Sequence, residues 1–302
     1  MKTDLAQTLS RGRLAVTAEY LPTRGADASA IRKLAARFPP RLDAVVVADN
    51  PDEVRGSALA HAAILAGEKI QPVLSLITRD RNRIALESDV LGAAALGIGS
   101  VLCLSGEHQS LGAGSQAAGA YDIDSVQLMA GIKTMCETGA GFAGGKVASA
   151  PELFLGAAAH PYLRPMELNL LRLRKKVRAG AAFFMTQAIF DLAGFSEWMD
   201  AVRAAGIDKQ AAIIASVLPL TSVDQAKRLA AKRTYGPVGQ EVIDRLAKAT
   251  DAAKEGIAIA AEMARKARAI AGVRGIHVLC GGCEGSAAAV IQEADLGDKV
   301  MS

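Results

Sequence analysis

The chain has 302 residues, of which 51% are apolar and 22% are charged, and its formal net charge at pH 7 is +4. This length and apolar content can bury a large core, as one large α/β domain or two modest ones, and they exclude a mostly disordered chain. Basic residues are scattered singly or in short clusters such as residues 172–176, and aromatic residues make up only 4% of the chain. A concentrated nucleic-acid-binding face is therefore excluded.

Eight short apolar runs alternate with longer stretches of helical period, which is typical of β/α units and a parallel sheet. The predicted strands are residues 13–20, 43–49, 71–78, 100–106, 152–159, 181–187, 211–219 and 275–281. Amphipathic helices are predicted over residues 28–38, 56–68, 82–97, 122–135, 165–180, 192–206, 222–233 and 284–294, with a further helical region over 239–271.

Eight such units in this length predict an α/β fold, a (β/α)8 TIM barrel with extra helices before the last strand, as a single domain over residues 1–302. The alternative is an open doubly wound sheet, because periodicity alone does not show closure. No apolar run reaches the roughly 18–20 residues of a membrane span, and residues 1–14 lack the apolar centre of a signal peptide. We therefore expect a cytoplasmic protein without a membrane partner.

Reactive side chains of such barrels gather where the strands end, and polar residues stand at most of the predicted ends. Glu19 lies in an apolar strand end, where a carboxylate is costly unless it is used in function or paired in a salt bridge. Residues 78–83, "TRDRNR", are either functional or a solvated helix start with Asp80 near the N-cap. His160 can equally be a loop residue, and Lys176 an exposed helix cation.

The four cysteines are too few for a secreted disulfide scaffold, and reduced thiols are expected. The pair Cys280 and Cys283 forms a CxxC, which can be a redox dithiol or half of a zinc site. Because a second ligand pair at suitable spacing is missing, we interpret "CGGC" as a tight turn at the barrel rim and predict no metal. Neither GxGxxG after the first strand nor a P-loop motif is found.

Several segments together resemble the methylenetetrahydrofolate reductase family, flavin-dependent TIM barrels of one-carbon metabolism. They are "TAEYLPTRG" with Glu19, "VADNPDEVRG" at 47–56, "TRDRNR" at 78–83, "LCLSGEH" at 102–108, "YDIDSVQL" at 121–128, "FFMTQAIFD" at 183–191 and "VLPLTSVDQAKRLA" at 217–230. The resemblance covers almost the whole chain in family order. It implies non-covalent FAD, NAD(P)H as co-substrate, and hydride transfer to 5,10-methylenetetrahydrofolate, which gives 5-methyltetrahydrofolate.

The resemblance also implies roles for individual residues. Glu19 matches the general acid of the family, in an environment that raises the pKa of a carboxyl group. Glu107 stands where relatives usually have an aspartate near flavin and pterin, and Gln187 and Gln225 fall on folate-contacting positions. The positions at or near FAD are Asp49, Asn50, Ser105, Gly106, Glu107, Asp122, His160, Asn169 and Lys176, of which Lys176 suits the pyrophosphate as a cation.

Departures from the family keep other functions open. Ser105 stands where relatives often have an arginine, and a folate-binding arginine of relatives falls near Cys283, which suggests looser binding of flavin or nicotinamide. One alternative is a flavin-free barrel that binds folate or a corrinoid partner and transfers methyl groups. Another is a non-catalytic or metal-bearing subunit of a one-carbon complex. Residues 111–120 are predicted to form a mobile loop beside FAD, and a homo-oligomer remains open.

Overall fold

A computed structural model describes residues 4–51, 53–111, 116–232, 236–280 and 285–296. Within them, eight parallel strands form one closed barrel in sequence order, and the last strand pairs with the first. The strands are β1 (Ala15–Tyr20), β2 (Ala44–Val47), β3 (Pro72–Ile77), β4 (Ser100–Leu104), β5 (Phe154–Ala159), β6 (Phe183–Ala188), β7 (Ala212–Val217) and β8 (Val273–Val278). The closed sheet confirms the predicted (β/α)8 barrel over the open doubly wound sheet.

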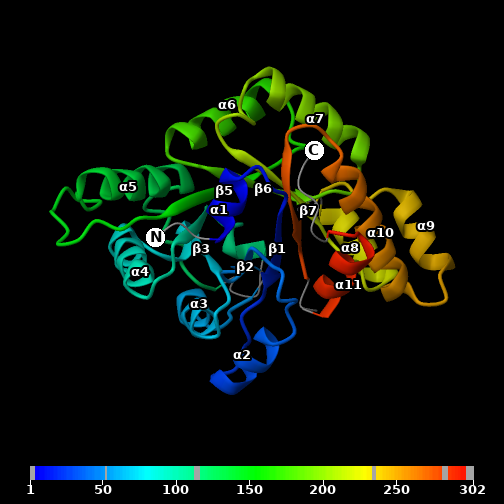
Figure 1. Ribbon diagram of the computed structural model, residues 1–302, viewed down its shortest axis with the longest axis horizontal. Coiled ribbons are helices and arrows are strands. Elements are labelled where there is room, and N and C mark those ends of the chain that lie inside the picture. The colour runs from blue at the N-terminus through cyan, green and yellow to red at the C-terminus, as the bar shows by residue number, and fades with distance from the viewer. Residues whose placement is uncertain (1–3, 52, 112–115, 233–235, 281–284, 297–302) are drawn as a thin grey trace.

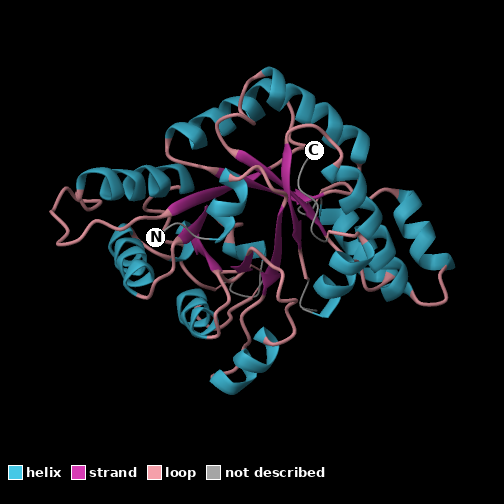
Figure 2. Cartoon of the chain, in the orientation of Figure 1, coloured by secondary structure: helices cyan, strands magenta, loops and turns pink. Residues whose placement is uncertain are grey.

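Most helices surround the barrel, with the strands at its centre (Figures 1 and 2). The α-helices are α1 (Asp4–Ser10), α2 (Ala28–Ala35), α3 (Ala58–Gly67), α4 (Arg83–Ala95), α5 (Ser125–Thr138), α6 (Met166–Arg178), α7 (Leu192–Ala204), α8 (Val223–Lys232), α9 (Gln240–Lys248), α10 (Ala252–Arg268) and α11 (Gly285–Glu293). Two short 3-10 helices are η1 (Thr78–Asp80) and η2 (Gln109–Leu111). The helical region predicted before the last strand is thus confirmed as two helices, α9 and α10. None of the helices described here is long and apolar enough to cross a membrane.

Side chains along each strand alternate between the barrel interior and the surrounding helices. Val46 and Met185 belong to a cluster inside the barrel. The adjacent residues Val45 and Phe184 belong to a separate cluster that includes the inner faces of the helices. Because both faces of the sheet are buried, the strands appear in the sequence as continuous apolar runs.

The seven-residue helix α1 closes the N-terminal end of the barrel. Its Leu5 and Leu9 lie on one face and pack in the interior cluster with Ala15 and Ala44, the first residues of β1 and β2. This helix was not predicted from the sequence, because two turns with two leucines show too little periodicity. Packing against the barrel stabilises it.

The segment 78–83 differs from a solvated helix start. The N-cap of α4 is Asn82, whose side chain accepts a hydrogen bond from the N–H of Ala85 at 3.1 Å. Asp80 lies two residues earlier, in η1, and pairs with Arg79, which is only 8% exposed. The two arginines at 79 and 81 therefore turn toward the barrel mouth instead of toward solvent.

Gly156 of β5 leaves room for the ring of Phe183 inside the barrel. A Cβ atom on Gly156 would lie 2.2 Å from Cζ of Phe183, which stacks on Phe154 with ring centroids 5.2 Å apart. We expect Gly156→Ala to lower the free energy of unfolding by about 1–3 kcal/mol through overpacking, as measured by chemical denaturation. Gly145→Ala is the matched control, because a Cβ there meets no atom within 4 Å. Equal losses in both variants would contradict this account of the interior.

Candidate active site

Closure of the barrel places Glu19 beside the end of the last strand. Ala18 of β1 pairs with Val278 of β8, and two residues farther along the backbone N–H of Cys280 donates to Oε2 of Glu19 at 3.1 Å. Glu19 is half-buried at the second-last position of β1. The predicted general acid is therefore held at the C-terminal mouth of the barrel by a backbone donor.

Asp49 follows β2, and its carboxylate is completely buried in an ion pair. Nη1 of Arg81 lies 2.6 Å from Oδ2, Nη2 lies 3.2 Å from Oδ1, and the N–H of Ile77 donates to Oδ2 at 3.0 Å. Arg81 also pairs with Asp89 of α4 at 3.0 Å. A fully buried carboxylate presents no surface to a ligand, so Asp49 fixes the mouth between β2 and β3.

The loop after β4 carries the predicted residues 105–107. Oγ of Ser105 donates to Oγ of Ser125 at 3.0 Å, which ties the loop to the start of α5. Gly106 has φ +80°, a conformation that favours glycine, and a Cβ there would lie 2.6 Å from Ile77. Glu107 is exposed at the mouth. The tight turn at Gly106 thus presents the Glu107 carboxylate to solvent at the end of β4.

Two predicted cofactor residues act within the protein itself. Asp122 forms two hydrogen bonds with the guanidinium of Arg83, at 2.8 and 2.9 Å, and these bonds lower the pKa of Asp122 to about 2. Asn169 is buried in α6 and donates to the backbone carbonyls of His160 and Leu163, at 2.8 and 3.1 Å. Asp122 therefore anchors the segment before α5, and Asn169 shapes the loop after β5.

Gln225 lies in the first turns of α8. Its Oε1 accepts hydrogen bonds from the N–H of Thr221 at 2.7 Å and from Oγ1 of Thr221 at 3.1 Å. The side chain is therefore engaged at the beginning of this helix. Gln225 does not line the cavity described below, whereas Gln187 does.

His160, Lys176 and Gln187 come together at the ends of β5 and β6. Nζ of Lys176 donates to the carbonyl of Ala158 at 2.6 Å, and burial, followed by the charge of Arg172, lowers the pKa of Lys176 to about 8. His160 is exposed on the wall of a cavity, and its side chain hydrogen-bonds to Gln187. Protein around the cavity reduces hydration of the His160 ring, and this desolvation, followed by the charge of Lys176, lowers the pKa of His160 to about 4, so the imidazole is neutral at pH 7.

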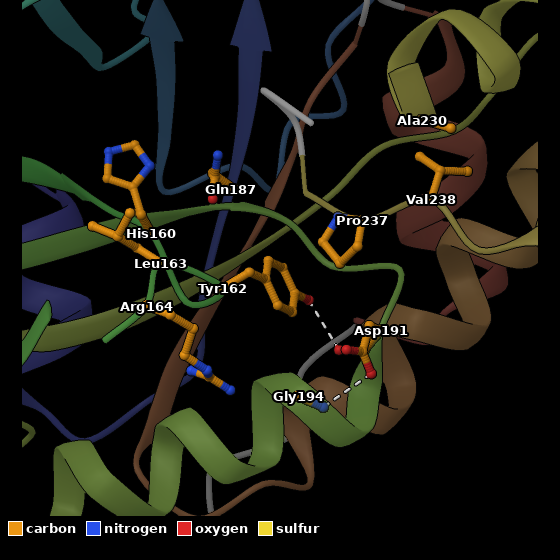
Figure 3. A pocket seen from close by; sticks show the side chains of 10 residues that line it. All are labelled: His160, Tyr162, Leu163, Arg164, Gln187, Asp191, Gly194, Ala230, Pro237 and Val238. Atoms are coloured by element: carbon orange, nitrogen blue, oxygen red, sulfur yellow. Dashed lines mark hydrogen bonds between the residues drawn. The ribbon is translucent and has the colours of Figure 1, made fainter. Parts of the chain in front are cut away.

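A cavity of about 580 Å³ opens from His160 and Gln187 toward α7 (Figure 3). His160 and Gln187 lie at one side, and the Tyr162 hydroxyl donates to the carbonyl of Asp191 at 2.9 Å at the other. The lining residues are His160, Tyr162, Leu163, Arg164, Gln187, Asp191, Gly194, Ala230, Pro237 and Val238. The volume is typical of small-molecule sites.

Residues 4–295 match the family model described as methylenetetrahydrofolate reductase. The chain belongs to the methylenetetrahydrofolate reductase family. It is 37% identical over 84 residues to the 5,10-methylenetetrahydrofolate reductase of Escherichia coli (strain K12), an alignment over 28% of this chain and only 26% of that protein. It is 25% identical over 226 residues to the enzyme of the same name from Pectobacterium carotovorum subsp. carotovorum, over 73% of this chain and 69% of that protein.

Solved structures share the barrel. A Clostridium thermocellum protein that binds two copies of 5-methyl-5,6,7,8-tetrahydrofolic acid superposes with a TM-score of 0.67 at 13% identity, over 97% of this chain and 99% of that chain. A 2,3-dimethylmalate lyase superposes with a TM-score of 0.53, also at 13% identity, over 100% of this chain and 91% of that chain. At these identities the likeness shows the fold.

In this member of the methylenetetrahydrofolate reductase family, four residues at the site were not predicted from the sequence: Arg79 and Arg81 at the mouth, and Tyr162 and Arg164 along the cavity. One sequence feature could have indicated the two arginines: acidic and basic residues directly after a buried strand suggest that their side chains pair within the protein. Tyr162 and Arg164 lie in a loop, where no periodicity indicates which side chains face inward.

Two other features fall partly outside the described residues. Cys280 is buried, whereas Cys283 lies outside them, as do residues 112–115 of the loop predicted to be mobile beside FAD. Within the described part of the chain, no group of three or more His, Cys, Asp or Glu residues could hold a metal ion.

Proposed function

We propose that this protein reduces 5,10-methylenetetrahydrofolate to 5-methyltetrahydrofolate, with FAD as a non-covalent cofactor and NAD(P)H as the electron source. The observation that carries the proposal is the position of Glu19, a carboxyl group held by the Cys280 N–H at the mouth of a closed barrel of this family. The names of the Escherichia coli and Pectobacterium relatives support the reaction. The folate-binding Clostridium barrel supports a folate substrate.

Glu19 acts as the general acid. The bridging methylene of the substrate accepts hydride only after the bond from its carbon to one nitrogen breaks, which leaves an iminium cation. The carboxyl group of Glu19 donates a proton to the departing nitrogen, and hydride then adds to the carbon. A positioned general acid typically contributes 10²–10⁴-fold to such a step.

Glu107 and Gln187 would recognise the pterin. The exposed carboxylate of Glu107 accepts hydrogen bonds from the amino face of the pterin and stabilises the positive iminium, an effect worth several kcal/mol of barrier in preorganised sites. The amide of Gln187, at the cavity wall, offers both a donor and an acceptor to the mixed pterin edge. Gln225, engaged with Thr221, would act through the loop before α8.

The described residues fit FAD by their donor chemistry. One N–H of Lys176 donates to Ala158, and an ammonium carries three, so the others can donate to the anionic pyrophosphate. Neutral His160 and the amide of Asn50 add uncharged hydrogen-bonding groups at the same mouth. Bound FAD would accept hydride from NAD(P)H and pass it to the methylene carbon. We assign indirect roles to the remaining predicted cofactor residues, which shape the loops: Asp49, Ser105, Gly106, Asp122 and Asn169.

Replacing the general acid separates the two half-reactions. We expect Glu19→Gln to slow folate reduction by about 10²–10⁴-fold, because the amide has no acidic proton. Reduction of FAD by NAD(P)H should change by less than about threefold, since that step needs no proton at the folate. Anaerobic rapid mixing, followed by flavin absorbance, measures each step.

If the Glu19→Gln protein carries out both half-reactions at wild-type rates, Glu19 is not the general acid. A wild-type protein that takes up no FAD and shows no bleaching with NAD(P)H would instead favour flavin-free methyl transfer. These two results are distinguishable, because the first concerns the variant and the second the wild type.

The lowered pKa of Lys176 predicts how FAD affinity depends on pH. The free amine loses its proton as the pH rises through about 8, and an anionic pyrophosphate binds the protonated form. The Kd for FAD should therefore rise above pH 8, by up to about tenfold per pH unit. Fluorescence titration of FAD between about pH 7 and about pH 9 measures this dependence.

Two variants control the pH experiment. Lys176→Arg keeps its charge and should show a flat profile over this range, since guanidinium does not deprotonate there. Lys175→Met, at the neighbouring exposed position, should retain the wild-type profile. A wild-type profile that matches that of Lys176→Arg would show that Lys176 does not hold the anionic part of FAD.

A further inference from the structure

Arg79 is a buried cation whose charge is balanced by its neighbour in sequence. Its side chain is 9% exposed, and burial of a charge is costly unless the charge is paired. Asp80 accepts two hydrogen bonds from the guanidinium, from Nε at 2.7 Å and from Nη2 at 2.8 Å. These bonds raise the pKa of Arg79, which stays positively charged.

The remaining donors of Arg79 reach two loops. Nη1 donates to the carbonyl of Glu107 at 2.9 Å, and Nη2 donates to the carbonyl of Asn50 at 3.1 Å. The backbone of Arg79 adds two more bonds, since its N–H donates to Ser105 at 3.2 Å and its carbonyl accepts from Ala120 at 2.8 Å. One residue thus joins the loops after β2 and β4 to the end of β3.

The loop after β2 has a backbone conformation that needs support. Asn50 has φ +42°, whereas the φ of +80° in the loop after β4 falls on Gly106, which adopts it without strain. A left-handed conformation at a residue other than glycine persists only where its surroundings hold it. The guanidinium group of Arg79 supplies that support, because its N–H groups lie in one plane and donate to the two carbonyls in fixed directions.

We propose that Arg79 is a positioning residue for folate reduction, which sets the direction of the Glu107 carboxylate by holding the Glu107 carbonyl. This inference rests on the proposed function. A lysine would retain the charge but would lose the planar fork that reaches Asp80, Asn50 and Glu107 together. The effect of Arg79 should therefore depend on the presence of the Glu107 carboxylate.

A double-mutant cycle tests this dependence. Arg79→Lys should slow the folate half-reaction about tenfold or more, because small displacements in an active site cost rate. In the Glu107→Gln background, Arg79→Lys should slow the folate half-reaction by less than about twofold, since the carboxylate that Arg79 positions is gone. Arg245→Lys is the matched control. Arg245 of α9 also takes part in ion pairs, with Glu255 and Glu262, but lies outside the barrel mouth, so this change should leave the rate unchanged.

The inference would be overturned if Arg79→Lys slowed the folate half-reaction by the same factor with and without the Glu107 carboxylate. It would also be overturned if Arg79→Lys slowed FAD reduction and folate reduction equally, because that result indicates general disruption of the site. If Arg79→Lys does not fold, Arg79→Gln keeps a planar amide donor and enters the same cycle. If wild-type protein shows no folate half-reaction, the proposed function fails separately. A crystal structure of the Arg79→Lys protein then decides the inference: a displaced Glu107 carbonyl supports it, and an unmoved one overturns it.

Discussion

Hydrogen bonding between β1 and β8 closes the barrel and brings together residues some 260 positions apart in the chain. Thr17 meets His277 at 2.9 Å inside this seam, and the Cys280 N–H reaches Glu19 at its end. In an open sheet these strands would be separate edges, and Glu19 would lack its backbone donor. The proposed chemistry therefore depends on closure, because only a ring of strands places carboxyl, imidazole and amide groups around one mouth.

The mouth has two sectors with different electrostatics. Between β2 and β4, the buried Arg79 and the half-buried Arg81 fix the loops through ion pairs and carbonyl contacts. Such pairs contribute little net stability, and we interpret them as devices that specify geometry. Beside β5 and β6, neutral His160 and Gln187 face the cavity, with Lys176 as the nearby cation. The sector that carries Glu107 thus lies beside an open sector suited to binding a ligand, because β4 pairs directly with β5.

Much of this arrangement could be predicted from the sequence. Strands that are buried on both faces appear as apolar runs, and in a (β/α)8 barrel the polar residues that follow the strands gather at one end. Glu19 and His160 were predicted in this way to lie at strand ends, and both lie there, while their roles stay predictions. Helix α1 was missed, because its stability comes from packing two leucines into the barrel. The internal pairing of Asp49 with Arg81 was also missed, because local pattern does not show which way an arginine after a strand turns.

The folate half-reaction of the wild-type protein tests the central claim most directly. FAD-loaded protein is reduced photochemically without oxygen, so that no nicotinamide is present, and is then mixed with 5,10-methylenetetrahydrofolate. The account predicts that flavin absorbance returns and that 5-methyltetrahydrofolate forms in an amount equal to the flavin oxidised. Flavin that stays reduced in the presence of the folate, with no 5-methyltetrahydrofolate formed, would contradict it.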